Sequence, residues 1–452
     1  YYIMRYKVKK MITYPTKYIL KISVPLILGM LIQVLVGVTD TAFLGRVGEV
    51  ELGASAIAGI VYLLAFMVSQ SFASGAQIIM ARRNGEQHYS KIARVLYQTL
   101  TFIVLFSALN IVLFYLFAPA GFEAALASQA VAEASAVYLS ARCWGLFMAG
   151  ATAVFRALFV AVTNTAQLFW AALILLVSNF ILDYWLIFGG LGVPAMGIKG
   201  AAVASVIAES VSAGYLILYM LKKVDLIKYG FQKFLLWNQA LFLDIFRLSI
   251  WIVIQNILSW GVWLYFFIEI EKLGENALAV SNILRSVSSL PFIFANAMSL
   301  AASSLVSNLI GCGKDDEVMP TAARLLKIGS VFYYGCLGVM AVFPTAFLRI
   351  YTDNPVVITE ALAPFGTMIL TYLSALPAMI YFYCILGTGK TRVALGIEII
   401  CSLVYIITVR LIVGVYEMSL AWCWTSEMSY YLLLLAISYA YMKRNKWCCE
   451  LV

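Results

Sequence analysis

Two aspartates lie in apolar stretches of this chain, where a charge is costly. Asp40 follows "LVGVT" (35–39), and Asp183 lies within "SNFILDYWLIFGG" (178–190). A carboxylate at the centre of a membrane helix costs about 2.5–3.5 kcal/mol on insertion scales, so such residues are rare and usually functional. Burial disfavours the charged form, and so does a second carboxylate nearby. Such a pair titrates as one unit, and it can carry a proton or hold a small cation.

The spacing of these residues predicts that they meet. Asn179 precedes Asp183 by four residues, so the two side chains share one face of a helix. Asp40 lies about 22 Å of helix beyond Pro25, near the far end of its span. Asp183 lies near the same end of its own span. The pattern therefore predicts a proton or Na⁺ site formed by Asp40, Asn179 and Asp183. For Asp40 the alternative is an interfacial residue that faces water.

Other polar residues inside apolar stretches are weaker candidates. Glu209 is a possible third coupling group, with a structural hydrogen bond or ion pair as the alternative. Gln255 is the candidate in the second half, where the matching stretches carry no acid in their middle. We therefore expect coupling chemistry in the first half of the chain. Four further charged residues are candidates for pairing across helices: Arg156, Arg285, Glu398 and Glu427.

The composition indicates a membrane protein, since 63% of the 452 residues are hydrophobic and 12% are charged. A membrane helix needs about 20 consecutive apolar residues. The sequence lacks the two-residue alternation of membrane barrel strands. It predicts an all-α polytopic membrane protein with twelve transmembrane helices, at 18–44, 53–80, 92–117, 132–160, 165–188, 198–221, 241–268, 277–310, 325–348, 359–386, 393–413 and 418–442.

The distribution of charge predicts the topology. The net charge is +9, and most Lys and Arg fall in loops on the side of the N-terminus. The positive-inside rule then places both termini in the cytoplasm, and it accounts for the basic balance without nucleic acid. His88 is the only histidine and is expected to be solvated, and the eight cysteines show no metal-binding spacing. We expect no cofactor.

An internal repeat of 226 residues predicts two similar lobes. Six spans per copy make the repeat parallel. We expect pseudo-symmetric six-helix lobes at 1–222 and 241–452, joined by a cytoplasmic linker at 223–240, around a central cleft that one chain completes as a monomer. The matching segments are "VGEVELGASAI" with "LGENALAVSNI", "RRNGEQHYSKIAR" with "GCGKDDEVMPTAAR", and "VTNTAQ" with "GTGKTR".

These features resemble the multidrug and toxic compound extrusion (MATE) family, and more closely its DinF-type prokaryotic branch. That branch has a kinking proline, a glutamine and an aspartate on its first span. They match Pro25, Gln33 and Asp40 in "VPLILGMLIQVLVGVTDTAFLGR". Its span 5 Asn/Asp pair and the following glycine-rich turn match "SNFILDYWLIFGGLGVPAMGIKGAA". Tyr138 stands where the branch has a pocket tyrosine. The resemblance implies that Pro25, Gln33 and Tyr138 belong to a substrate pocket or gate.

Two features depart from the family pattern. The carboxylates that another branch carries on spans 7 and 10 are absent. The second-half turn "GVYEMSLAWCW" (414–424) lacks the glycines of its first-half counterpart, which puts the geometry of spans 11 and 12 in doubt.

The resemblance implies a non-enzymatic multidrug exporter in the bacterial inner membrane, in contact with lipid. It would expel organic cations or amphiphiles in exchange for protons or Na⁺. One alternative is a flippase for lipid-linked oligosaccharide or lipid, which usually has more spans and a strongly cationic cavity. Another is an intramembrane aspartyl protease. That enzyme needs a Gly-x-Gly-Asp motif, which "GVTD" and "FILD" do not supply.

Overall fold

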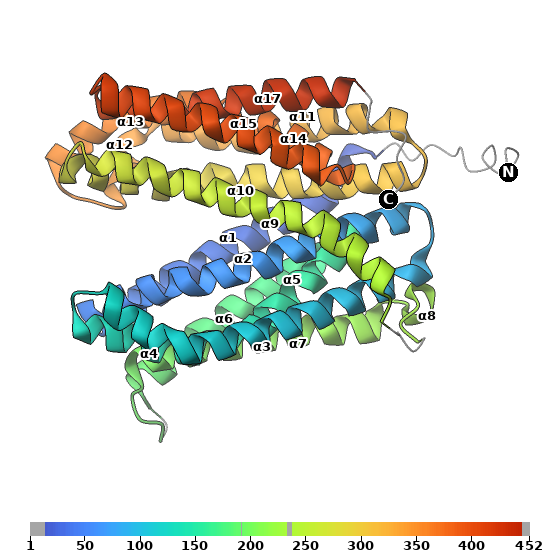
Figure 1. Cartoon of the computed structure of the whole chain (residues 1–452), viewed down its shortest axis with the longest axis horizontal. Coiled ribbons are helices and arrows are strands. Elements are labelled where there is room, and N and C mark those ends of the chain that lie inside the picture. Colours follow the sequence, from blue (N-terminus) through green and yellow to red (C-terminus); the bar gives the residue numbers. More distant parts are fainter. Residues whose placement is uncertain (1–13, 191, 233–236, 445–452) are drawn as a thin grey trace, which may run out of the picture.

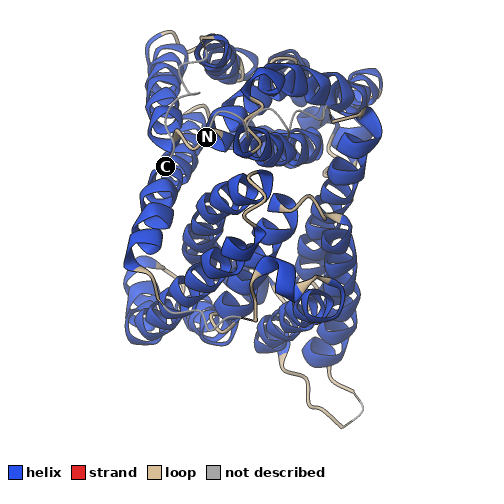
Figure 2. Cartoon of the chain, turned by 90° about the vertical axis from the view of Figure 1, so that its right-hand side faces the viewer, coloured by secondary structure: helices blue, strands red, loops and turns tan. Residues whose placement is uncertain are grey.

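A computed structural model describes residues 14–190, 192–232 and 237–444 of the chain. The described part is helical apart from one isolated bridge between Gly190 and Val193. Figures 1 and 2 show two groups of helices packed side by side. The first group contains α1 (Thr16–Leu44), α2 (Glu49–Gly85), α3 (Ile92–Ala125), α4 (Gln129–Arg142), α5 (Gly145–Ala161), α6 (Ala166–Phe188) and α7 (Gly197–Lys223).

The second group follows the short helix α8 (Leu226–Tyr229). We call the first group the N-lobe and the second the C-lobe. The C-lobe contains α9 (Gln239–Glu271), α10 (Glu275–Gly311), α11 (Val318–Val342), α12 (Pro344–Arg349), α13 (Pro355–Tyr372), α14 (Ala375–Gly387), α15 (Thr391–Val409), α16 (Leu420–Cys423) and α17 (Ser426–Lys443).

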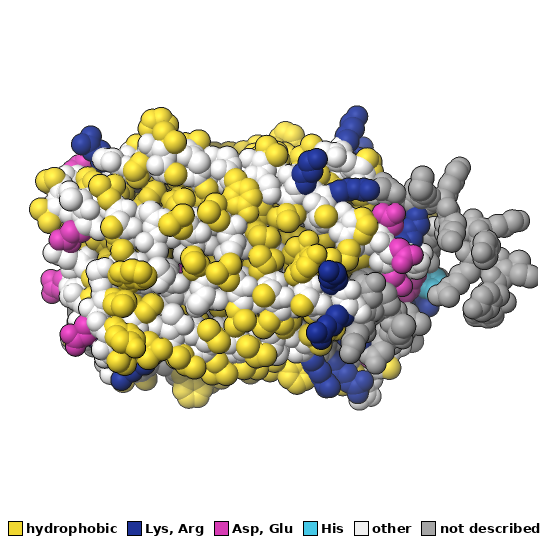
Figure 3. Space-filling view, turned by 90° about the horizontal axis from the view of Figure 1, so that it is seen from above, with side chains coloured by type: hydrophobic (Ala, Val, Ile, Leu, Met, Phe, Trp, Pro, Cys, Tyr) yellow, Lys and Arg dark blue, Asp and Glu magenta, His cyan; other side chains and the backbone are white. Residues whose placement is uncertain are grey.

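The predicted polytopic helical fold is confirmed. Among the described residues, ten helices are long and apolar enough to cross a membrane, and α4 with α5, bent by 51°, forms an eleventh span. The 18-residue α17 occupies the place of the predicted twelfth span, but it does not meet the same criterion of length and hydropathy. Hydrophobic side chains cover the middle of the surface, and charged ones gather at its two ends (Figure 3). This distribution is that of a protein whose apolar middle lies in the bilayer and whose charged ends lie in water.

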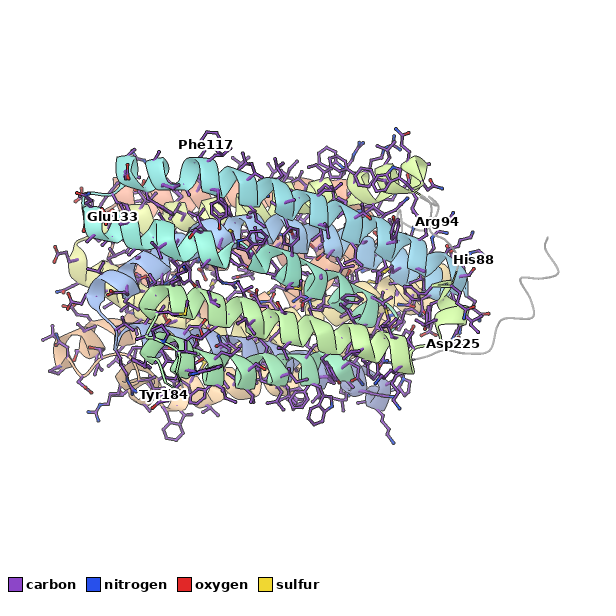
Figure 4. All side chains as sticks on the ribbon, turned by 90° about the horizontal axis from the view of Figure 1, so that it is seen from below. His88, Arg94, Phe117, Glu133, Tyr184 and Asp225 are labelled. Atoms are coloured by element: carbon purple, nitrogen blue, oxygen red, sulfur yellow. The ribbon has the colours of Figure 1, made fainter. Side chains whose placement is uncertain are left out.

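The two ends of the bundle differ in charge. Lys and Arg gather at the end where α1 begins and α17 ends (Figures 1 and 3). Arg94 and Asp225 lie at this end, and Glu133 lies at the other (Figure 4). We call these the basic end and the opposite end.

The backbone repeats the sequence duplication. Gln87 and Gly313 are 226 residues apart and both have left-handed backbone angles, with φ of 61° and 66°. Thr163 and Gly389 repeat the relation with φ of 58° and 84°. Such angles are uncommon outside glycine, so their recurrence at the same spacing reflects a shared turn design. The turns that follow α2 and α10, and those that follow α5 and α14, therefore come from one template.

The C-lobe has a π-helical turn where the N-lobe has a glycine-rich turn. In the N-lobe, α6 ends at Phe188 and is followed by Gly189, whose φ is 82°. At the matching place α15 continues into a π-helical turn, Arg410–Val415, and Glu417 has a φ of 47°. The short helix α16 then precedes α17. The chain thus reverses direction without the missing glycines, and the two connections differ in geometry.

The lobes meet at the basic end, where α2 crosses α10. A Cβ atom on Gly85 would overlap the backbone of Asn308, and one on Gly311 would overlap the backbone of Arg82. These two close approaches are related by the 226-residue repeat. Only glycine permits backbones to come this close. We call this crossing the seam.

Hydrogen bonds join the lobes across the seam. Arg82 Nη2 donates to the Thr388 carbonyl at 2.6 Å, and Asn308 Nδ2 donates to the Ala161 carbonyl at 3.0 Å. Asn84 Nδ2 donates to Asn308 Oδ1 at 2.7 Å. Side chains therefore satisfy carbonyls at the ends of helices in the opposite lobe, which otherwise lack partners. The seam holds the basic end of the molecule closed.

Candidate functional site

The structure brings Asp40, Asn179 and Asp183 together in the N-lobe. Asp40 lies on the last turn but one of α1, and Asn179 and Asp183 lie on α6, which packs along α1. The two carboxyls interact with each other and with the Asn179 amide. Asn179 and Asp183 are both 0% exposed, and Asp40 is half-buried. We call these three residues the N-lobe acid cluster.

The orientation of α6 explains the burial of this cluster. Tyr184 directly follows Asp183 and points away from the bundle (Figure 4). Its side chain is 64% exposed. Because successive helical residues point about 100° apart, Asp183 can face the interior while Tyr184 faces outward.

The N-lobe acid cluster has unused hydrogen-bonding capacity. Both carboxyl oxygens of Asp183, one of Asp40 and both polar atoms of the Asn179 amide are buried without a geometric hydrogen bond among the described residues. Buried polar atoms normally have partners. A proton shared between the carboxyls would satisfy them, and so would a cation held by carboxyl and amide oxygens. No group of three or more His, Cys, Asp or Glu in the described part could hold a metal ion.

An ion pair stands beside the cluster. Arg142 donates from Nη1 and Nη2 to Glu209 Oε2 and Oε1 at 2.9 and 2.5 Å, a bidentate geometry. The guanidinium also lies 4.0 Å from the centre of the Tyr62 ring. Tyr138, one turn before Arg142 on α4, lies near both Arg142 and Asp40. The structure thus places Glu209 in an ion pair, which is the structural alternative weighed for it.

Arg142 sits at the break between α4 and α5, where Gly145 makes room for the pair. A Cβ atom on Gly145 would overlap the ends of the Arg142 and Glu209 side chains. The C-lobe repeats the break between α13 and α14. The break is therefore part of the repeated design, and in the N-lobe it places the guanidinium beside the cluster.

The remaining predicted site residues lie farther from the carboxyls. Helix α1 runs without interruption through Pro25, about four turns from Asp40. Gln33 is exposed and lies two turns from Asp40 on the same helix face. Gln255 lies in the C-lobe, 7% exposed, with Oε1 unpartnered and Ser259 one turn beyond it on α9. His88 is exposed, as expected for a solvated residue, and its Nδ1 lies 3.1 Å from Glu86 Oε2.

The C-lobe contains a cavity of about 490 Å³ that the sequence did not indicate. Helices α9, α10, α13, α15 and α17 contribute to its walls. Eight of its seventeen lining residues are aromatic, among them Trp263, Tyr372, Tyr405 and Tyr430. Two acids, Glu398 and Glu427, and one arginine, Arg285, also line it. We call it the C-lobe cavity.

The two glutamates of the C-lobe cavity differ in their partners. Glu398 accepts hydrogen bonds from Ser259 Oγ at 2.5 Å and from the Tyr430 hydroxyl at 2.9 Å. Glu427 is 9% exposed, and its Oε2 makes no hydrogen bond within the described residues. Glu398 is therefore fixed by neutral donors, whereas Glu427 retains a free oxygen.

The four candidates for pairing across helices, Arg156, Arg285, Glu398 and Glu427, are all described and form no ion pair with one another. Arg285 instead lies over the Trp263 ring, 5.2 Å from its centre. Within the described part neither arginine is within 4.0 Å of a carboxylate. Hydrophobic spans give little signal for which charged residue meets which partner across helices, because most of the segment is apolar.

One sequence signal could have located the C-lobe cavity. Glu398, Ser402 and Tyr405 are spaced four and three residues apart, so they form one polar stripe along α15. Glu427 and Tyr430 repeat the spacing on α17. Two such stripes on consecutive spans indicate a shared interior site.

Known proteins provide an independent comparison. The MatE family profile matches residues 25–185 and again 252–411, once in each lobe. The chain is 24% identical over 336 residues to "Probable multidrug resistance protein NorM" of Rhizobium meliloti (strain 1021), covering 74% of this chain and 72% of that protein. It is 26% identical over 360 residues to the protein of the same description in Thermotoga maritima, covering 77% and 75%.

Solved structures share the fold. A multidrug resistance MATE family transporter of the MOP superfamily, in an outward-facing conformation, superposes with a TM-score of 0.88 at 16% identity, over 95% of each chain. The double profile match agrees with the 226-residue repeat in sequence and backbone.

Proposed function

This chain belongs to the MatE family, whose members are transporters, and we propose that it exports organic cations or amphiphiles in exchange for protons. The observation that carries the proposal is the N-lobe acid cluster, in which the buried Asp183 and Asn179 and the half-buried Asp40 have unused hydrogen-bonding capacity. Curated relatives described as multidrug resistance proteins support the substrate class. The first-lobe residues favour the DinF-type branch.

Each residue of the cluster has a role in the proposed cycle. Asp40 takes up the proton, Asp183 shares or stabilises the charge, and Asn179 orients the two carboxyls. Protonation removes the cost of burying charge and allows α1 to pack closely against α6. Pro25 removes one backbone hydrogen bond from α1, which gives that helix a point at which to bend. The movement of α1 then changes the shape of the substrate cleft.

The charge asymmetry supports one orientation of the protein in the membrane. Lys and Arg favour the cytoplasmic side, so we assign the basic end, with both termini, to the cytoplasm. With this orientation, the seam closes the cytoplasmic side of the molecule. We place the protein in the bacterial inner membrane, where one chain provides both lobes of the cleft and acts as a monomer.

The flippase alternative is less well supported. A carrier of anionic lipid-linked sugars needs a strongly cationic cavity. The C-lobe cavity instead has two acids and one arginine, which favours cationic cargo.

A transport assay tests the proposal. Purified protein in liposomes receives a pH gradient in sodium-free buffer, and ethidium efflux is measured. We expect efflux by the wild type, none by Asp40→Asn, and wild-type efflux by Glu133→Gln, an exposed acid at the opposite end. Equal efflux by Asp40→Asn would contradict the coupling role. Efflux that requires added sodium would mean that Na⁺, and not the proton, is the coupling ion.

A further inference from the structure

We propose that the C-lobe cavity binds a monovalent organic cation, with Glu427 as its charge partner. The identification of that cation as the exported substrate rests on the function proposed above, but the binding site itself does not. Coupling and substrate binding then reside in different lobes.

The size and walls of the cavity suit such a ligand. Its volume of about 490 Å³ lies in the range of sites for drug-sized molecules. Trp263, Tyr405 and Tyr430 come from three different helices and present ring surfaces to one space. Aromatic faces attract cations, most strongly where water is excluded. A single metal ion would leave most of this volume unfilled.

The charges of the lining also favour a cation. Glu398 is occupied by Ser259 and Tyr430, whereas Glu427 keeps a buried oxygen without a partner. Arg285 forms an ion pair with neither acid, because it lies over Trp263 and beyond ion-pair distance from both, although its charge still belongs to the lining. With both acids ionised, the lining has a formal charge of −1, which one monovalent cation balances.

Arg285 and Ser289 indicate where a ligand enters. Both line the cavity from α10 and both are exposed, whereas Glu427, which lines the same cavity from α17, is buried. A flat or globular cation entering past Ser289 therefore meets the aromatic walls before it reaches the carboxyl.

Helix α9 links this cavity to the N-lobe. Ser259 on α9 bonds Glu398 in the cavity, and Asn256 on the same helix donates to Ser71 of α2 at 2.7 Å. One turn of α9 thus contacts both the proposed ligand site and the helix that forms the seam. A ligand that shifts α9 changes the contact between the lobes, which gives a physical route for coupling over a distance.

The test measures binding of tetraphenylphosphonium to the full chain in nanodiscs. Triphenylphosphine oxide serves as a neutral ligand of similar shape. We expect Glu427→Gln to lower the affinity for tetraphenylphosphonium about tenfold or more while leaving that for the neutral oxide unchanged. Unchanged cation affinity in a folded Glu427→Gln protein would overturn the proposal. So would failure of the wild type to bind the cation.

A steric variant covers the case in which Glu427→Gln does not fold. Ser289→Trp fills the entrance and should lower the affinity for both ligands about tenfold or more. Asn282 is exposed on the same helix but does not line the cavity, so Asn282→Trp should leave the affinities for both ligands unchanged. Wild-type binding by Ser289→Trp would overturn the proposal. Normal binding by the wild type without proton-driven efflux would instead refute the proposed export function and leave the binding site standing.

Discussion

The two lobes share a backbone design but carry their acids in different places. At the 226-residue spacing, Asp40 corresponds to Phe266, Asp183 to Val409, and Glu398 to Ala172. Each of these three acids therefore has an apolar counterpart in the other lobe. The N-lobe acids lie together between two helices near the opposite end, whereas those of the C-lobe line an aromatic cavity. After the duplication, the turns and the seam stayed alike while the polar centres diverged.

The largest expected effect tests whether coupling belongs to one lobe. Asp183→Asn removes a carboxyl from the N-lobe acid cluster, so proton-driven ethidium efflux from liposomes should fall to the level of protein-free vesicles. Val409→Ala alters the corresponding position of the C-lobe and should retain efflux. Loss of coupling in both variants would mean that the lobes contribute symmetrically.

The seam offers a test of what the lobes share. Gly85→Val and Gly311→Val should each force α2 and α10 apart, and each should lower the free energy of unfolding by about 1–3 kcal/mol through overpacking. Because the two contacts are symmetric, the two losses should be similar. Gly338→Val, whose added side chain meets open space, is the control. Thermal unfolding in detergent measures all three, and a loss in only one seam variant would contradict the symmetry.

Cys312 reports opening of the same seam. Its thiol donates to the Gly85 carbonyl at 3.1 Å, and burial raises the pKa of this thiol. The reactive thiolate is therefore scarce at neutral pH, and maleimide labelling should accelerate as pH rises toward that raised pKa. Gly85→Val should accelerate labelling at every pH. Equal rates in the wild type and the variant, read by peptide mass spectrometry, would mean that the seam remained closed.

The ion pair beside the N-lobe acid cluster allows a comparison of smaller effect. Gly145→Ala places a methyl group against Arg142 and Glu209 and should destabilise the fold by about 1–2 kcal/mol. Gly396→Ala, in open space within α15, should stabilise it by up to about 1 kcal/mol, because alanine favours helix. Thermal unfolding in detergent measures both variants. If both substitutions stabilise the protein, Gly145 is not needed to accommodate the Arg142–Glu209 ion pair.

The smallest effect comes from the paired turns. Gln87→Gly should raise the free energy of unfolding by about 0.5–1 kcal/mol, because a non-glycine residue there holds a left-handed conformation. Gly313→Gln should lower it by a similar amount. Melting temperatures in detergent measure both. If the two substitutions change the free energy of unfolding in opposite directions, one turn design serves both lobes. A change in the same direction for both would refute that claim.

The sequence predicted the helical spans, the repeat and the meeting of Asp40 with Asp183. These succeed because span length and helical spacing are local properties. The C-lobe cavity was not predicted, because Glu398 and Glu427 belong to different spans and their approach depends on how α15 packs on α17. The sequence named Arg285 as a candidate for pairing but not its partner, which in the structure is the Trp263 ring. Long-range packing in uniformly apolar segments is where sequence patterns carry least information.

The most direct test of separate coupling and binding sites uses one preparation of Asp40→Asn. Tetraphenylphosphonium binding in nanodiscs and proton-driven efflux of the same cation from liposomes are measured side by side with the wild type. We predict that the variant binds the cation with affinity within about threefold of the wild type but produces no efflux above protein-free liposomes. Loss of both binding and efflux would place the cation at the N-lobe acid cluster and contradict the separation.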